Sequence, residues 1–261
     1  MKIASLGFRT DLMLLEMGGS VVTDHGRHLV VRTPANPGFH WGNFLLFESP
    51  PQRGDASRWS ASFEAEFPEA RYRAFGVDGV AGAVGDRTER QVLGVTAEVD
   101  TVLTADRLVS SGAAPQADVR LLTCDDEWRQ VLELHFACYG LPSDSDGRHF
   151  AERQVAGYRS LCEAGHGSWA GAFVEDRLCA GAGLFADASG LARFQNVATH
   201  PDFRRRGLAS AVIRHAAQRA RLPADIRKLV IVADPDDDAI RLYRALGFVD
   251  AEQQVQLHNA G

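Results

Sequence analysis

The chain has 261 residues, of which 45% are hydrophobic and 24% charged, and its formal net charge is −6. This composition is typical of a globular protein and gives room for one large domain or two ordinary ones. The acidic balance argues against a nucleic-acid or anionic-membrane partner. No apolar run reaches the ~18 residues that would cross a bilayer.

The cysteines and the first residues of the chain indicate the cellular compartment in which the protein is expected. Four cysteines lie far apart without Cys-x-x-Cys spacing, so we expect no zinc site and a role as small buried hydrophobes: Cys124, Cys138, Cys162 and Cys179. The opening residues lack the apolar stretch of a signal peptide. We therefore expect a reduced, cytoplasmic protein.

The first half is rich in predicted strands. Trp59, Phe63 and Phe67 recur every four residues, which predicts a helix whose aromatic stripe lies in the core. Ser, Gly, Ala and Pro at 110–115 form a predicted linker. We therefore divide the chain into a β-rich domain at 1–112 and a second domain at 117–261. The elements expected before the linker are strands at 21–23, 28–32, 41–47, 71–77 and 92–103 and a helix at 57–67.

The second half has the clearer pattern. Its expected strands are 119–123, 169–174, 178–185, 191–199, 229–233 and 252–257, and its expected helices are 125–139, 149–163, one that opens at 204–210, and 239–246. His135 falls on the apolar face of the first of these helices, where a core or boundary position is more common than a catalytic one.

The segment at 195–220 has the features of a phosphate cradle. Pro201 breaks the preceding strand, and three arginines and Gly207 then lead into a helix with an apolar stripe. The first turn of a helix offers unpaired N–H groups and the positive end of the dipole. Gly207 lets a ligand approach the backbone, Ala209 is small, and Arg204, Arg205 and Arg206 add charge that suits phosphate.

A second motif follows the apolar strand at 229–233. The acidic residues at 234–238 precede a short helix that carries Ala239, Leu242, Tyr243 and Leu246 on one face. Gly247 suits the left-handed residue that ends a helix.

Together the two motifs resemble the Gcn5-related N-acetyltransferase (GNAT) superfamily. Arg204-x-x-Gly207-x-Ala209 is similar to its acetyl-CoA pyrophosphate motif, and Asp236-x-x-Ala239-x-x-Leu242-Tyr243-x-x-x-Gly247-Phe248 to its next block. The family commonly has Asn where this chain has Asp236. The resemblance implies an α+β fold, a mixed and mostly antiparallel sheet flanked by helices, in the order β-α-α-β-β-β-α-β-α-β.

The resemblance also implies a function: transfer of acetyl from acetyl-CoA, without a metal, to a small-molecule amine that attacks the thioester directly. The backbone of Val197 and Thr199 would bind the pantetheine arm, and the Val197 N–H would stabilise the oxyanion. Tyr243 would protonate the departing thiolate. The coenzyme-binding residues implied in this way are Val197, Ala198, Thr199, Arg204, Arg205, Arg206, Gly207, Leu208, Ala209, Ser210, Asp236 and Tyr243.

The general base is missing from its usual place. Relatives often carry a carboxylate near the position of Gln195, and glutamine cannot take a proton at neutral pH. Asp144, Asp146, His149 or a water chain would have to act instead. The two aspartates also favour a small cationic amine as acceptor, through local charge attraction.

The first half repeats part of the same element order, which suggests a degenerate GNAT-like copy. Its counterpart of the cradle has one arginine, Arg53, beside Asp55, so pyrophosphate should be repelled. An unrelated β-rich domain is the alternative. A tandem monomer and a homodimer both stay open.

Two other functions also stay open. A coenzyme-binding regulator without transfer chemistry would explain Gln195 and Asp236. An ATP-binding domain would fit the αβ pattern, although the chain has no Gly-x-x-x-x-Gly-Lys-Ser/Thr loop.

Overall fold

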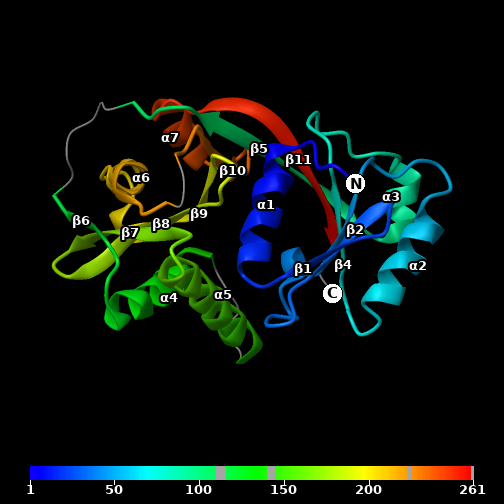
Figure 1. Cartoon of the computed structure of the whole chain (residues 1–261), viewed down its shortest axis with the longest axis horizontal. Coiled ribbons are helices and arrows are strands. Elements are labelled where there is room, and N and C mark those ends of the chain that lie inside the picture. Colours follow the sequence, from blue (N-terminus) through cyan, green and yellow to red (C-terminus); the bar gives the residue numbers. More distant parts are fainter. Residues whose placement is uncertain (110–115, 140–144, 223–224, 260–261) are drawn as a thin grey trace. The chain divides into compact units, whose positions relative to one another are not determined.

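The structure is a computed structural model that describes residues 1–109, 116–139, 145–222 and 225–259. It forms two compact units, each built from more than one stretch of chain (Figure 1). The first comprises Met1–Leu103, Val232–Asp237 and Asp250–Gly261, and the second Thr104–Ile231 and Asp238–Val249. The predicted linker at 110–115 lies outside the described residues. No described helix is long and apolar enough to span a membrane.

The first unit contains a sheet in the order β1-β2-β3-β4-β11-β5. Strands β3 and β4 are parallel, whereas β1/β2, β2/β3 and β4/β11 are antiparallel. The last strand of the chain thus completes the sheet of the first unit. The elements are α1 (Leu6–Met17), β1 (Val21–Asp24), β2 (His28–Arg32), β3 (Phe44–Phe47), α2 (Ala56–Glu66), β4 (Arg73–Val77), α3 (Arg87–Leu93), β5 (Thr96–Ala105) and β11 (Val249–Asn259).

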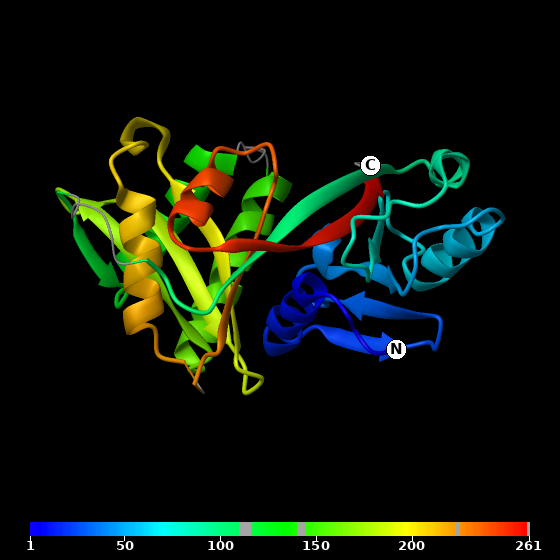
Figure 2. The ribbon, with the colours of Figure 1, turned by 90° about the horizontal axis from the view of Figure 1, so that it is seen from above.

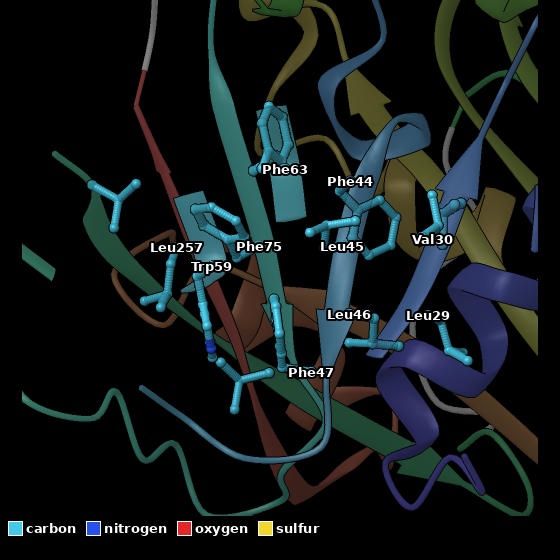
Figure 3. Close-up of a cluster of buried hydrophobic side chains, with 14 of the residues drawn as sticks. Leu29, Val30, Phe44, Leu45, Leu46, Phe47, Trp59, Phe63, Phe75 and Leu257 are labelled. Carbon is cyan, nitrogen blue, oxygen red and sulfur yellow. The ribbon is translucent and has the colours of Figure 1, made fainter. Parts of the chain in front are cut away.

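The aromatic stripe of α2 lies in the core of this unit, as predicted (Figure 3). Trp59 stacks on Phe47 of β3 with ring centroids 3.7 Å apart, and Phe63 meets Phe75 of β4 edge-on at 5.3 Å. Such a cluster buries a large apolar area and fixes α2 against the sheet.

Two helices of the first unit were not predicted. Helix α1 has one local cap, since the Ser5 hydroxyl accepts the Phe8 N–H at 3.3 Å, and it also depends on distant carboxylates. Asp78 accepts the N–H groups of Ala4 and Ser5, and Glu252 accepts that of Leu6 at 2.6 Å. Helix α3 begins and ends with local signals that the sequence does contain. Asp86 caps its N-terminus, and Gly94 ends it with a φ of 68°.

Three predicted strands of this unit begin later than expected, one of them, β4, by only two residues, at Arg73 instead of 71. The residues at 41–42 belong to a 3₁₀ turn, His40–Gly42, so β3 starts only at Phe44. The prediction of a strand from 92 onwards is wrong for its first residues, because α3 occupies them and β5 starts at Thr96.

The second unit contains strands in the order β6-β7-β8-β9-β10. In Figure 1, α4 and α5 cover one face of this sheet and α6 and α7 the other, and Figure 2 looks onto α6. The predicted order of its elements is confirmed. They are β6 (Asp118–Leu121), α4 (Asp125–Tyr139), α5 (Ser145–Glu163), β7 (Gly167–Val174), β8 (Arg177–Ala186), β9 (Leu191–Thr199), α6 (Leu208–Arg219), β10 (Lys228–Ala233) and α7 (Ala239–Ala245).

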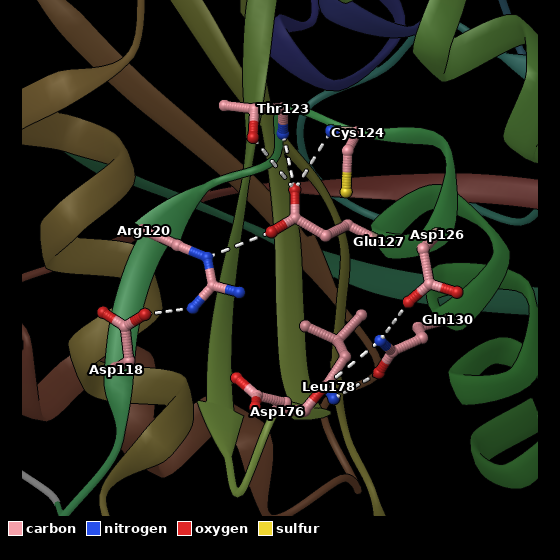
Figure 4. Close-up of polar contacts among 9 residues, drawn as sticks. All are labelled: Asp118, Arg120, Thr123, Cys124, Asp126, Glu127, Gln130, Asp176 and Leu178. Carbon is pink, nitrogen blue, oxygen red and sulfur yellow. Dashed lines mark hydrogen bonds and ion pairs between the residues drawn. The ribbon is translucent and has the colours of Figure 1, made fainter.

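A buried carboxylate ties α4 to the edge strand (Figure 4). Glu127 accepts the N–H groups of Thr123 and Cys124 at 2.6 and 3.2 Å, so it caps the start of its own helix. It also pairs with Arg120 of β6 at 3.0 Å. Burial alone would raise the pKa of Glu127, but these N–H groups and the guanidinium hold it below its ordinary value.

The cysteine prediction is wrong at one position. Cys179 is buried and Cys138 and Cys162 are half-buried, whereas Cys124 is exposed because it precedes α4 in a surface turn. All four are free thiols.

The two halves of the chain share one element order, α-β-β-β-α-β-α-β, which runs from α1 to β5 and again from α5 to β11. In each copy the third strand is parallel to the fourth, as β3 is to β4 and β9 to β10. The predicted fold class, a mixed and mostly antiparallel sheet flanked by helices, is confirmed.

Candidate active site

A β-bulge interrupts strand β9 in the second unit. Gln195 pairs with Gly183 of β8, and Ala198 pairs with Gly181, so Asn196 and Val197 oppose the single residue between the two glycines. Asn196 has a φ of 49°, a left-handed conformation that asparagine tolerates better than most residues. A bulge bends its strand and takes backbone groups out of the ladder. The N–H predicted to stabilise an oxyanion, that of Val197, lies at this irregularity.

On its other side, strand β9 pairs with β10 over only part of its length. Its ladder with β10 joins Leu191, Ala192 and Arg193 to Lys228, Leu229 and Val230. Among the described residues no later pair joins the two strands, although β9 continues to Thr199. The far end of β9 thus has a backbone edge that could bind an extended ligand as an added strand would.

The turn after β9 presents the N-terminus of α6. Arg205 and Gly207 have φ values of 61° and 76°, and Gly207 occupies the N-cap position without a capping side chain. A Cβ at Gly207 would meet no atom within 4 Å. The start of α6 thus has no capping side chain and has open space beside Gly207, which is the arrangement that binds anions at helix ends.

Three arginines of this turn directly precede that helix end in the chain. Arg204 donates to the Thr199 carbonyl at 3.4 Å, and Arg206 donates to the Asp202 carbonyl at 3.0 Å. The Arg206 guanidinium also lies over the Phe203 ring, 4.8 Å from its centroid. All three arginines are exposed, so their charge is available to a ligand at the helix end.

The predicted acid, Tyr243, is buried in α7 on the α6 side of the sheet. Its ring meets Phe248 at 6.3 Å, and Phe248 in turn meets Phe194 of β9 at 6.1 Å. Phe248 therefore links the tyrosine to the strand that carries the bulge. The predicted left-handed residue after this helix is confirmed, since Gly247 has a φ of 96°.

The remaining predicted site residues fall into three groups. Ala198 and Leu208 are buried, so only their backbones could contact a ligand, whereas Ala209 and Ser210 are half-buried on the first turn of α6. Asp236 belongs to the segment Val232–Asp237 of the first unit and is exposed, with its N–H bonded to Asp234 Oδ1 at 2.8 Å.

The candidate bases are only partly described. Asp144 and the side chain of Asp146 lie outside the described residues. His149 is exposed on α5. His135 is 1% exposed, and burial lowers its pKa to about 4, so it stays neutral near pH 7 and accepts a proton poorly. Its predicted place in the core is confirmed.

Sequence reasoning missed a polar cluster on the α5 side of the bulge. Gln195 Nε2 donates to the Tyr158 hydroxyl at 3.3 Å, and Asn196 Nδ2 donates to Gln154 Oε1 at 3.5 Å. Gln154 and Tyr158 are four residues apart and so share a face of α5. That spacing was visible in the sequence, but its meeting with β9 depends on tertiary structure.

The counterpart of α6 in the first unit is closed. At the start of α2, the buried carboxylate of Glu89 accepts the Ala56 N–H at 2.8 Å, and Asp55 accepts the Gln52 N–H at 2.8 Å. The β3/β4 ladder runs through Phe47 and Val77, and the Asp78 N–H continues it by donating to the Phe47 carbonyl. The first unit thus lacks both the open helix end and the separated strands of the second.

The residues from 128 to 248 match the family model described as the acetyltransferase (GNAT) family. They include the bulged strand, the open start of α6 and the tyrosine of α7. This part of the chain belongs to the GNAT family. A search of curated proteins finds no match.

Solved structures extend the likeness in fold to the first half. A functionally unknown conserved protein from Staphylococcus epidermidis is 15% identical, with a TM-score of 0.70 over 91% of this chain and 92% of that one. A GCN5-related N-acetyltransferase from Kribbella flavida is 16% identical, with a TM-score of 0.68 over 98% and 96%. A tandem GNAT protein from the clavulanic acid biosynthesis pathway is 14% identical, with a TM-score of 0.54 over 94% and 87%. At these identities the likeness shows the fold alone.

Proposed function

We propose that the protein is an N-acyltransferase that moves an acetyl group from acetyl-CoA to a small-molecule amine. The observation that carries the proposal is the uncapped N-terminus of α6, with Gly207 in a left-handed conformation and three exposed arginines beside it. This helix end follows strand β9, whose described residues after Arg193 form no ladder pair with β10. A phosphate group and an extended amide-containing arm, joined as in CoA, match this pair of features.

In the proposed reaction the chain's own residues orient and polarise the thioester. The N–H groups of Leu208, Ala209 and Ser210 and the arginines bind the pyrophosphate. The backbone of β9 from Val197 to Thr199 bonds the pantetheine amides. The Val197 N–H stabilises the oxyanion that forms when the amine attacks the carbonyl carbon. Tyr243 donates a proton to sulfur as the C–S bond breaks.

We further propose that the first half is a degenerate GNAT-like copy that does not bind the coenzyme. The shared element order and the parallel pairs β3/β4 and β9/β10 support common descent of the two halves. Glu89 occupies the helix end at which a phosphate would bind. In this proposal the domains are 1–112 and 117–261, and the site lies in the second.

A second candidate function is a coenzyme-binding regulator without transfer chemistry, which the neutral side chain of Gln195 favours. An assay that follows free thiol release from acetyl-CoA separates the two. An acetyltransferase releases CoA in a manner that depends on an added amine, and forms the amide in equal amount. Binding of acetyl-CoA with no amine-dependent release across a broad amine panel would support the regulator and contradict the enzyme.

A further inference from the structure

The side chains around Gln195 indicate which class of amine the proposed active site accepts. This inference rests on the proposed function. Trp169, Gly183 and Gln195 form a row across β7, β8 and β9, since Trp169 pairs with Gly183 and Gly183 with Gln195. Directly paired residues share one face of a sheet. Gln195 and Trp169 therefore lie on the same face of the sheet, the face that α4 and α5 cover (Figure 1), and the Trp169 ring lies over Gly183 between them.

The amide of Gln195 is oriented by its neighbours. Its Nε2 donates to the Tyr158 hydroxyl at 3.3 Å and lies 3.5 Å from Asn196 Oδ1. This assignment leaves the carbonyl oxygen, Oε1, directed away from those partners, where it can accept an N–H bond from an arriving amine. An amide oxygen accepts a hydrogen bond but not a proton.

The surroundings of Gln195 disfavour a charged acceptor. Behind it lie Trp169 and Tyr158, with ring centroids 5.2 Å apart and both nearly buried. Ring faces attract an ammonium ion only modestly, and neither ring supplies the negative charge that would offset the hydration lost on burial.

The described titratable and charged groups that face this part of β9 are few. They are Tyr158 of α5, His135 and Cys138 of α4, and Arg193, which lies two residues before Gln195 on the same strand face. Cys138 interacts with the backbone of Thr199, and burial raises the pKa of its thiol, so it stays neutral near pH 7. The ring of His135 meets Trp169 at 5.9 Å. No carboxylate is among these described groups, and a guanidinium does not attract a cation.

The proton balance of the reaction agrees with a neutral acceptor. When a free amine attacks, its nitrogen loses one proton as the C–N bond forms, and the sulfur gains one as the C–S bond breaks. An ammonium acceptor would release an additional proton that needs a base. We infer that this site selects amines that are uncharged at neutral pH, such as arylamines and alkoxyamines, and that Gln195 determines this selectivity. The acidic residues at 144 and 146 predict the opposite class, a cationic amine.

The test compares three acceptors of similar size: an arylamine, an alkoxyamine and a primary alkylamine. For the wild-type protein at pH 7, kcat/KM for the first two should exceed that for the alkylamine by at least about tenfold. Between pH 7 and 9, kcat/KM for the alkylamine should rise about tenfold per unit, because the free-base fraction rises by that factor, while the arylamine value stays level.

The variant Gln195→Glu supplies the missing base. It should raise kcat/KM for the alkylamine at pH 7 at least about tenfold and flatten its pH profile, with little change in the KM of acetyl-CoA. Tyr158→Phe, which removes the partner that orients Gln195, should raise the KM of the arylamine several-fold without changing the pH profile. Ser160→Ala, exposed on the same helix, is the control and should change neither.

Two results would count against this inference, and they are distinguishable. Transfer that prefers the alkylamine at pH 7, with a level profile in the wild-type protein, overturns the selectivity and leaves the acetyltransferase intact. Failure to bind acetyl-CoA in a calorimeter overturns the proposed function, and the selectivity with it. The pH profiles of kcat/KM in the wild-type protein test the selectivity even if Gln195→Glu does not fold.

Discussion

The starts of α2 and α6 occupy the same place in the element order of the two halves, yet they meet different partners. At α2 a carboxylate from the same unit, Glu89, accepts the first helical N–H. At α6 the corresponding end has no capping side chain and three exposed arginines around it. One helix end is thus satisfied by the protein, and the other is left for an anion from solution.

The pairs of parallel strands beside these helices also differ: one pair is joined along its length and the other separates. The β3/β4 ladder extends through Phe47 and Val77, whereas the β9/β10 ladder stops at Arg193 and Val230.

The third difference concerns the short helix that follows. Four residues before its left-handed glycine, α7 has Tyr243 and α3 has Arg90. A coenzyme site needs all three features, so the comparison indicates why only one half should retain it.

The largest effect should come from Tyr243, whose position in the first half is occupied by Arg90. Tyr243→Phe should lower kcat about a hundredfold, because loss of a general acid typically costs 10²–10⁴ in rate. The affinity for acetyl-CoA should change far less, since the hydroxyl acts when the thiolate leaves. Steady-state kinetics with calorimetry separates the two. An unchanged kcat, with chemistry shown to limit the rate, would remove Tyr243 from the mechanism.

The next effect concerns the charge around the two helix ends. Arg206→Glu should weaken CoA binding more than about tenfold, since a charge-assisted contact contributes ~1.5–3 kcal/mol and reversal adds repulsion. Arg53→Glu, the matched reversal in the exposed turn before α2, should leave the dissociation constant unchanged. Equal losses in the two variants would show that net charge, and not the α6 end, governs binding.

A smaller effect, on stability, should follow removal of the Glu89 carboxylate at the start of α2. Glu89→Ala leaves the Ala56 N–H unpaired in a buried place, which should lower the free energy of unfolding by about 1–3 kcal/mol. The control Glu64→Ala removes an exposed ion pair with Arg73 and should cost less than about 1 kcal/mol. Urea denaturation measures both. If the two variants lose equal stability, Glu89 does not hold the start of α2.

How far the sequence predicts this structure depends on whether the signals are local. Helix α4 and strand β9 have the predicted bounds, Asp125–Tyr139 and Leu191–Thr199, because their hydrophobic periodicity lies within the element. Helix α1 was missed although Ser5 caps it locally, because the other N–H groups at its start are bound by Asp78 and Glu252, far away in the chain.

Some features of the candidate site were likewise predictable from local signals, and others were not. The turn with Arg205 and Gly207 was expected from its glycine and its charges, and the structure places both residues in left-handed conformations. The bulge at Asn196 and the bond from Gln195 to Tyr158 were not, since each depends on a register or a packing contact that no sequence spacing encodes.

The most direct test of the difference between the halves is the number of CoA molecules bound per chain. Calorimetric titration of the full chain with CoA, at a ligand concentration well above the dissociation constant, gives this number. We expect one CoA per chain in the wild-type protein and in Glu89→Ala, and strongly weakened binding in Arg206→Glu. Two CoA molecules per wild-type chain, or none, would contradict the account.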